Sequence, residues 1–113
     1  MIEKTGHTPV LLNEVMKALD PKPKKTYIDA TFGDGGYSRR ILETSECNVI
    51  AIDRDPLVVD KAIKFKKEFC NRFDFFNCKF SELESLLTSL KIRFFDGIVF
   101  DLGVSSMQID NKE

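Results

Sequence analysis

The sequence predicts an α/β fold in which helices flank a parallel sheet. Short β-branched and aromatic segments alternate with longer segments whose apolar residues recur at helical spacing. The segment NVIAID at residues 48–53 is apolar almost throughout, as strands of a parallel sheet are when both faces are buried. This alternation is the pattern of right-handed β-α-β units, and no repeat or low-complexity tract interrupts it.

Length and composition indicate one soluble domain at most. The chain has 113 residues, 42% of them hydrophobic and 31% charged, and 17 basic residues stand against 18 acidic ones. No apolar run reaches the roughly 18 residues of a membrane-spanning helix, and the N-terminus lacks the pattern of a signal peptide. We therefore expect a cytoplasmic protein with no membrane partner.

The three cysteines, Cys47, Cys70 and Cys78, form no C-x-x-C pair. An odd number without that spacing argues against a disulfide framework or a structural zinc site, so no metal is expected. The formal net charge of −1 also gives no sign of the basic face that free-standing nucleic-acid binders carry. Evidence for an RNA partner must therefore come from other features.

The first elements in order are a helix and a strand. Thr8 followed by Pro9 is a typical helix start, and the helix is expected to end at Asp20, before the prolines of residues 21–25. Its apolar residues fall on one face: Val10, Leu11, Val15 and Leu19. The segment TYIDATF then predicts a strand over residues 26–32.

The remaining elements continue this alternation. Strands are predicted at residues 48–53, 73–77 and 96–102, and helices at residues 38–46 and 55–70. Asp55 and Pro56 are typical of a helix start. Ser81 and Glu84 match a capping box, S-x-x-E, before a last leucine-rich helix.

The first predicted strand runs into a glycine-rich turn. Gly33, Gly35 and Gly36 lie within four positions, so the backbone can turn tightly and approach a ligand without a Cβ in the way. Asp53 ends the second strand, twenty residues after Gly33. A carboxylate at this distance can accept hydrogen bonds from ribose hydroxyls. An ordinary strand-to-helix turn, with Asp53 near the start of the next helix, is the alternative.

The pattern alone leaves two cofactor classes open. A dinucleotide-binding loop would place a third small residue where Ser38 stands. Asp29 before the turn favours S-adenosylmethionine, because a carboxylate suits the ammonium and sulfonium of that ligand and would repel a pyrophosphate. The fourth strand ends in Asp101, which is expected to face the reacting groups unless it merely terminates the strand.

Four ordered motifs resemble the ribosomal RNA small subunit methyltransferase H family. They are HTPVLLNE at residues 7–14, DATFGDGGYSR at residues 29–39, AIDRDP at residues 51–56 and DLGVSS with Gln108 at residues 101–108. The resemblance implies a Rossmann-like class I methyltransferase fold. It also implies methyl transfer from S-adenosylmethionine to the N4 amino group of a cytidine in the decoding centre of small-subunit (16S) ribosomal RNA, in the bacterial cytoplasm.

The resemblance also assigns cofactor contacts by position. They fall on Gly35, Gly36, Tyr37, Asp53, Phe80, Asp101 and Gln108. Phe80 would pack on the adenine, while Asp101 and Gln108 would lie near the methionine and methyl end. The family usually has histidine where Tyr37 stands, so a backbone contact at this position survives the change and a side-chain contact need not.

The implied chemistry needs no covalent enzyme intermediate. Cytosine N4 is a poor nucleophile, so the site must hold it in line with the S–CH3 bond and accept its hydrogen bonds as it becomes tetrahedral. Asp101 is the expected catalytic acceptor, with residues 103–106 as the neighbouring surface. His7 is a weaker candidate, and its alternative role is that of a loop histidine capping the first helix.

The expected sheet is truncated after its fourth strand. Methyltransferases of this class have seven strands, and this family carries a helical insertion that contributes to RNA binding. We expect residues 1–113 to be the N-terminal part of a single methyltransferase domain, without that insertion or the later strands. The fourth strand should then leave Ile98, Val99 and Phe100 as an unpaired edge open to self-association.

Two functions stay open at this point. The first is a methyltransferase that is active only when another segment or self-association completes it. The second is a catalytically silent remnant that at most binds S-adenosylmethionine. A dehydrogenase half-domain is a third and more distant reading of the glycine turn. The expected partner in the first case is small-subunit ribosomal RNA or the small ribosomal subunit, and neither DNA nor a membrane is expected.

Overall fold

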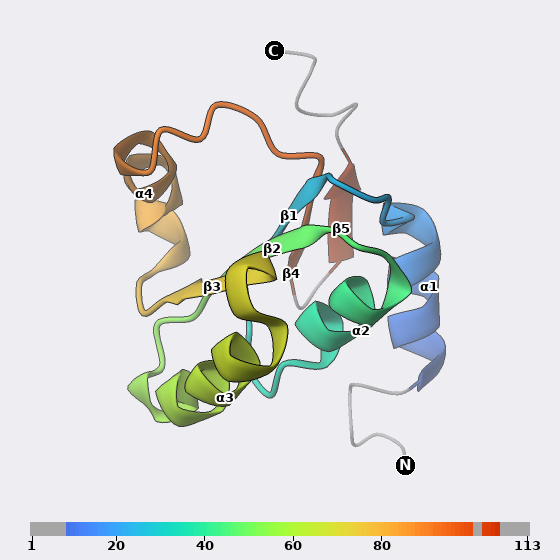
Figure 1. The fold of residues 1–113 in the computed structure, drawn as a ribbon, viewed down its shortest axis with the longest axis horizontal. Helices are drawn as coiled ribbons and strands as arrows, with labels where there is room; N and C mark the ends of the chain where they lie inside the picture. The colour runs from blue at the N-terminus through green and yellow to red at the C-terminus, as the bar shows by residue number, and fades with distance from the viewer. Residues whose placement is uncertain (1–8, 101–102, 107–113) are drawn as a thin grey trace.

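The computed structural model describes residues 9–100 and 103–106 and contains a five-stranded sheet with the order β3-β2-β1-β4-β5 (Figure 1). Its parallel strands are β1 (Thr26–Asp29), β2 (Asn48–Ile52), β3 (Phe73–Phe76) and β4 (Gly97–Phe100). A short strand, β5 (Gly103–Ser106), runs antiparallel to β4. The predicted α/β class is confirmed.

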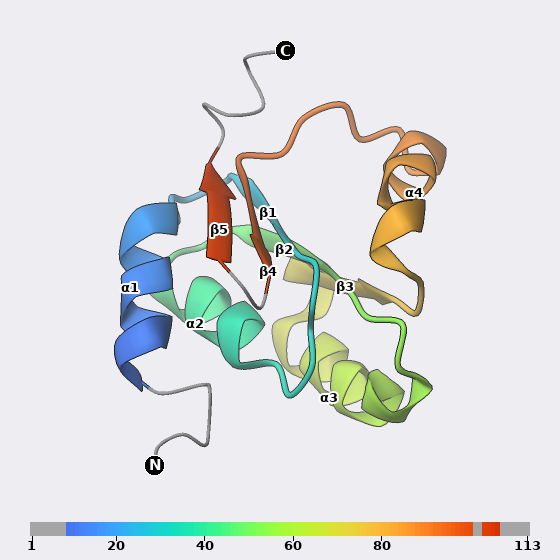
Figure 2. The ribbon, with the colours of Figure 1, turned by 180° about the vertical axis from the view of Figure 1, so that it is seen from behind.

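Helices cover the two faces of the sheet unequally (Figures 1 and 2). One face carries α1 (Pro9–Leu19), α2 (Gly36–Thr44) and α3 (Val59–Phe69), and the other carries α4 (Leu83–Ser89). Side chains alternate along each strand, so Val49 faces the three-helix layer and Ile50 faces α4. Among the described residues, no helix has both the length and the apolarity to cross a membrane.

The fourth strand does not form the edge of the sheet. The expected unpaired edge at Ile98, Val99 and Phe100 is wrong, because β5 lies along it and places Val104 opposite Val99. Ile98 and Val99 are buried. The backbone groups on this side of β4 are therefore paired with β5 of the same chain. The expected self-association through an unpaired β4 edge consequently has no structural basis.

The turn before α4 also differs from the prediction. Ser81 and Glu84 do not form the capping box, because Ser81 lies inside a 3₁₀ turn over Phe80–Glu82 that leads into α4. The carboxylate of Glu82 instead accepts the backbone N–H of Lys79 at 2.7 Å. The bond fixes the start of the turn that carries Phe80.

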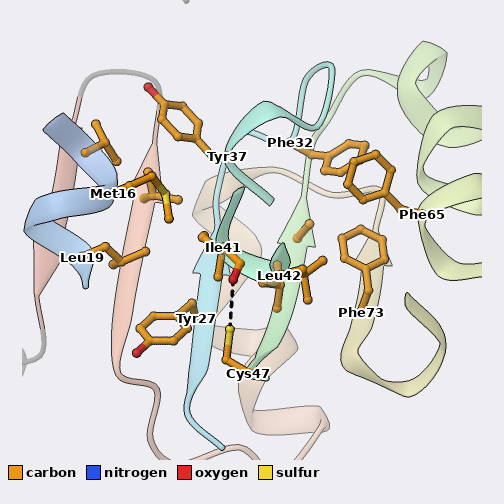
Figure 3. Packing of buried hydrophobic residues seen from close by; sticks show 14 of the residues in the cluster. Met16, Leu19, Tyr27, Phe32, Tyr37, Ile41, Leu42, Cys47, Phe65 and Phe73 are labelled. Atoms are coloured by element: carbon orange, nitrogen blue, oxygen red, sulfur yellow. Dashed lines mark hydrogen bonds between the residues drawn. The ribbon is translucent and has the colours of Figure 1, made fainter. Parts of the chain in front are cut away.

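Three phenylalanine rings pack together at one end of the larger core, on the side of α3 and β3 (Figure 3). Phe32 follows β1, Phe65 lies on α3 and Phe73 begins β3. The ring centroids of Phe32 lie 5.1 Å from Phe65 and 5.6 Å from Phe73, and those of Phe65 and Phe73 are 5.4 Å apart. These separations are typical of packed aromatic pairs. The cluster joins the turn after β1 to α3 and β3.

Arg39 connects α2 to α3 outside this core. Its guanidinium donates two hydrogen bonds to the Glu68 carboxylate, at 2.9 and 2.8 Å, and lies 4.7 Å from the centre of the Phe65 ring. The hydrogen bond to Arg39 lowers the pKa of the Glu68 carboxyl group. Because the pair is exposed, solvent screens it, and it orients the two helices more than it stabilises them.

We expect Phe73→Ala to lower the free energy of unfolding by about 3–5 kcal/mol, the range for truncating a fully buried phenylalanine. Phe94→Ala is the matched control, because the Phe94 side chain is 75% exposed and its loss should cost less than about 0.5 kcal/mol. Urea unfolding followed by circular dichroism measures both changes. Equal losses for the two variants would contradict the stabilising role of the buried Phe73 side chain.

Candidate functional site

A cavity of about 520 Å³ opens at the carboxyl ends of β1 and β2. Its lining comes from α1, the turn after β1, the start of α2, the end of β2 and the loop after β3. The lining residues are Leu12, Ala30, Thr31, Phe32, Gly33, Asp34, Gly36, Tyr37, Asp53, Arg54, Cys78 and Phe80. Open parallel sheets bind ligands at this edge, and the volume is in the ordinary range for a small-molecule site.

The glycine turn forms one side of the cavity. Gly33 and Gly35 adopt positive φ angles of 53° and 87°, a backbone region that residues other than glycine rarely occupy. A Cβ added to Gly35 would lie 2.5 Å from Cζ of Phe65. Position 35 therefore requires glycine both for its backbone angle and for the close approach of the aromatic core. The first turn of α2 begins at the next residue, Gly36.

Asp53 is already oriented toward the glycine turn. Its Oδ2 accepts the N–H of Gly33 at 2.7 Å, and its Oδ1 accepts the N–H of Asp55 at 3.0 Å. Each carboxylate oxygen can accept more than one hydrogen bond, so both can still receive a ligand hydroxyl. The structure thus brings together the two features that the sequence places twenty residues apart.

Asp29 lies under the turn rather than on the cavity surface. It is fully buried, and its carboxylate accepts the Ser38 hydroxyl at 2.6 Å and the Thr31 N–H at 3.2 Å. Thr31 lines the cavity and Asp29 does not. The hydrogen bonds of Asp29 join the end of β1 to the first turn of α2.

Phe80 and Cys78 supply the side of the cavity that follows β3. The Phe80 ring is 57% exposed and packs edge-to-face on Phe100, with ring centroids 5.7 Å apart. An aromatic ring that is half open to solvent beside a cavity can stack on a planar ligand group. Burial, aided by the charge of Glu82, raises the pKa of the Cys78 thiol. Cys78 therefore contributes a neutral, weakly polar surface at neutral pH.

Four of the residues predicted to bind a cofactor line this one cavity, namely Gly36, Tyr37, Asp53 and Phe80. The fifth, Gly35, is buried and shapes the turn from behind. Asp101 and Gln108 lie outside the described residues, as does His7.

Sequence reasoning missed several residues of the lining. Arg54 and Cys78 are neighbours of predicted residues along the chain, so their positions at strand ends could have indicated them. Leu12 comes from α1, far from the other lining residues in sequence, and only the packing of α1 brings it there. Within residues 9–100 and 103–106, no cluster of His, Cys, Asp and Glu could hold a metal ion.

Comparison with known proteins places this geometry in context. The model of the family described as the MraW methylase family matches residues 4–113. The chain is 53% identical over 104 residues to the ribosomal RNA small subunit methyltransferase H of Rickettsia akari, which covers 92% of this chain and 33% of that relative. It is 48% identical over 109 residues to the protein of the same name from Rhodospirillum rubrum, and this match covers 96% of this chain and 33% of that relative. The chain spans about one third of the length of these relatives.

Solved structures share the fold. P. horikoshii TYW2 in complex with MeSAdo matches with a TM-score of 0.54 and 25% identity over 64% of this chain and 28% of that one. A dimethyladenosine transferase from Plasmodium falciparum matches with a TM-score of 0.60 over 82% of this chain and 41% of that one. At 16% identity, the second likeness concerns the fold alone.

The turn allows a test that separates backbone strain from steric exclusion. Gly33→Ala should lower the free energy of unfolding by about 1–2 kcal/mol, because φ is positive but a Cβ would have room. Gly35→Ala should cost a further 1–3 kcal/mol or so, since the Phe65 ring must also move. Urea unfolding of the two variants measures the difference. Equal losses would show that the contact with Phe65 does not constrain position 35.

Proposed function

Because this chain belongs to the MraW methylase family, we propose that it supplies the S-adenosylmethionine site of a methyltransferase acting on small-subunit ribosomal RNA. One observation carries the proposal: the glycine turn, Asp53 and Phe80 converge on a single cavity at the carboxyl ends of the strands. Relatives that match nearly the whole chain are named as ribosomal RNA methyltransferases. Methylation of the ribosome would take place in the cytoplasm.

The residues of the cavity fit an adenosyl ligand. The Asp53 carboxylate, which lines the cavity, would accept the two ribose hydroxyls, and the exposed face of Phe80 would stack on the adenine. Gly35, Gly36 and Tyr37, at the start of α2, would lie along the methionine moiety. The related structure with MeSAdo bound supports this class of ligand.

Tyr37 stands where the family usually has histidine. Its ring is buried in the three-helix layer and also lines the cavity, so it helps to shape the wall from within the core. A ligand contact through the Tyr37 backbone needs no imidazole. We therefore propose that the substitution is compatible with cofactor binding.

The target would be the N4 amino group of a cytidine in the decoding centre. Bound S-adenosylmethionine supplies a methyl group on a positively charged sulfur. The enzyme would hold the amino nitrogen in line with the S–CH3 bond. It would also accept the hydrogen bonds of the amino group as the nitrogen lone pair is withdrawn from the ring. Asp101, which follows β4 directly in sequence, is the proposed acceptor, and Gln108 the proposed second contact near the methyl end.

Cofactor binding tests the first part of the proposal. Wild-type protein should bind S-adenosylhomocysteine in isothermal titration calorimetry, and Asp53→Asn should weaken binding by about tenfold or more, because hydrogen bonds to a charged acceptor are lost. Asp55→Asn is the control, since the Asp55 carboxylate accepts the Leu57 N–H and does not line the cavity. No binding by the wild type, or equal binding by both variants, would overturn the assignment.

Methyl transfer tests the second part. In a preparation that transfers labelled methyl groups to small ribosomal subunits, Asp101→Asn should lower the rate by on the order of 10² at saturating cofactor, if the carboxylate acts in the transition state. Digestion of the RNA to nucleosides and mass spectrometry should identify N4-methylcytidine in the wild-type product. An unchanged rate removes Asp101 from the mechanism, and a different methylated nucleoside refutes the N4 assignment.

A further inference from the structure

We infer that Asn77 is a positioning residue for the cofactor site and acts through Asp53. Asn77 follows the last residue of β3, and its side-chain Nδ2 donates a hydrogen bond of 2.8 Å to the backbone carbonyl of Asp53. The inference rests on the proposed function, because it concerns the recognition of the ribose by Asp53. Nothing in the cofactor motifs themselves points to Asn77.

The position of Asp53 explains why such a bond is needed. The last paired residues of the two strands are Ile52 and Phe76, so Asp53 lies just beyond the regular ladder between β2 and β3. Its N–H reaches the Phe76 carbonyl only at 3.4 Å, which is long for a backbone hydrogen bond. The shorter bond from Asn77 therefore takes over from the ladder at the residue that carries the carboxylate.

The bond completes a chain of contacts across three strand ends. Asn77 holds the carbonyl of Asp53 on the β3 side, while the Asp53 carboxylate accepts the Gly33 N–H on the β1 side. This carbonyl belongs to the peptide bond between Asp53 and Arg54, so the Asn77 bond also orients the backbone that leads to Arg54, a residue that lines the cavity. Asn77 also starts the segment that leads to Phe80. Its bond thus fixes the spacing between the ribose acceptor and the proposed adenine-stacking ring.

The chemistry of position 77 is specific. A carbonyl oxygen can only accept, so only the NH2 group of the Asn77 amide can serve, and the orientation of the amide follows. Aspartate has nearly the same shape but would place a carboxylate against that carbonyl. Asn77 is exposed, so water can satisfy the carbonyl when the bond is lost. The loss should therefore disturb the alignment of Asp53 more than it disturbs folding.

The test measures binding of S-adenosylhomocysteine to the wild type, Asn77→Asp, Asn77→Ala, Asp53→Asn and the double variant with Asn77→Ala and Asp53→Asn. We expect each Asn77 variant to bind several-fold to about tenfold more weakly, with an unchanged midpoint of urea unfolding. In the Asp53→Asn background the same Asn77→Ala change should have less than about a twofold effect, because the two residues act as a unit. Asn71→Ala is the control, at the opposite end of β3.

The outcomes separate the two claims. If the wild type does not bind S-adenosylhomocysteine, the proposed function fails, and this inference fails with it. If the wild type binds and Asp53→Asn weakens binding, but both Asn77 variants bind as the wild type does, only the role of Asn77 is refuted. Additive losses in the double variant also refute it, because they would mean that Asn77 acts independently of Asp53. If Asn77→Asp does not fold, the Asn77→Ala cycle decides.

Discussion

The close approach of Phe65 to Gly35 is the contact on which the cavity depends. A glycine without a Cβ lets the ring of α3 lie directly against the turn that follows β1, and Phe32 and Phe73 complete the cluster behind it. Within the turn, the N–H of Gly35 donates to the Phe32 carbonyl at 2.7 Å and the N–H of Gly36 donates to the Asp34 carboxylate at 3.1 Å. The shape of the turn therefore depends both on these local hydrogen bonds and on the packed core behind it. The site therefore has the rigidity of the hydrophobic layer beneath it.

Polar contacts then set the details of that turn from two sides. Below it, the buried carboxylate of Asp29 joins the end of β1 to Ser38 on α2. Beside it, Asp53 receives the Gly33 N–H. A carboxylate removed from water is costly unless hydrogen bonds replace its hydration, and the short Ser38 bond contributes to that replacement. Asp29 therefore stabilises the turn, whereas Asp53 lines the cavity, where a ligand could contact it.

Much of the fold and of the site could be predicted from sequence because its signals are local. Apolar strands and helical periodicity gave the α/β class, and the spacing of Gly33 and Asp53 placed them at one edge of a parallel sheet. The antiparallel β5 escaped prediction because a four-residue segment containing two serines has no apolar pattern that marks a strand. The contacts of Leu12 and Asn77 escaped it because they depend on tertiary packing and on where the ladder ends.

The unequal covering of the sheet has a consequence for local unfolding. The face opposite the three-helix layer is covered by α4, a helix of two turns with one fully packed residue, Leu83. Such an element opens with a lower free energy than the central strands, and its amide hydrogens should exchange as one cooperative unit. The turn that carries Phe80 continues directly into α4. A ligand that stacks on Phe80 would bind this unit only in its folded form. Binding would therefore stabilise α4 and slow the exchange of its amide hydrogens. This effect would occur on the face of the sheet opposite α2 and α3.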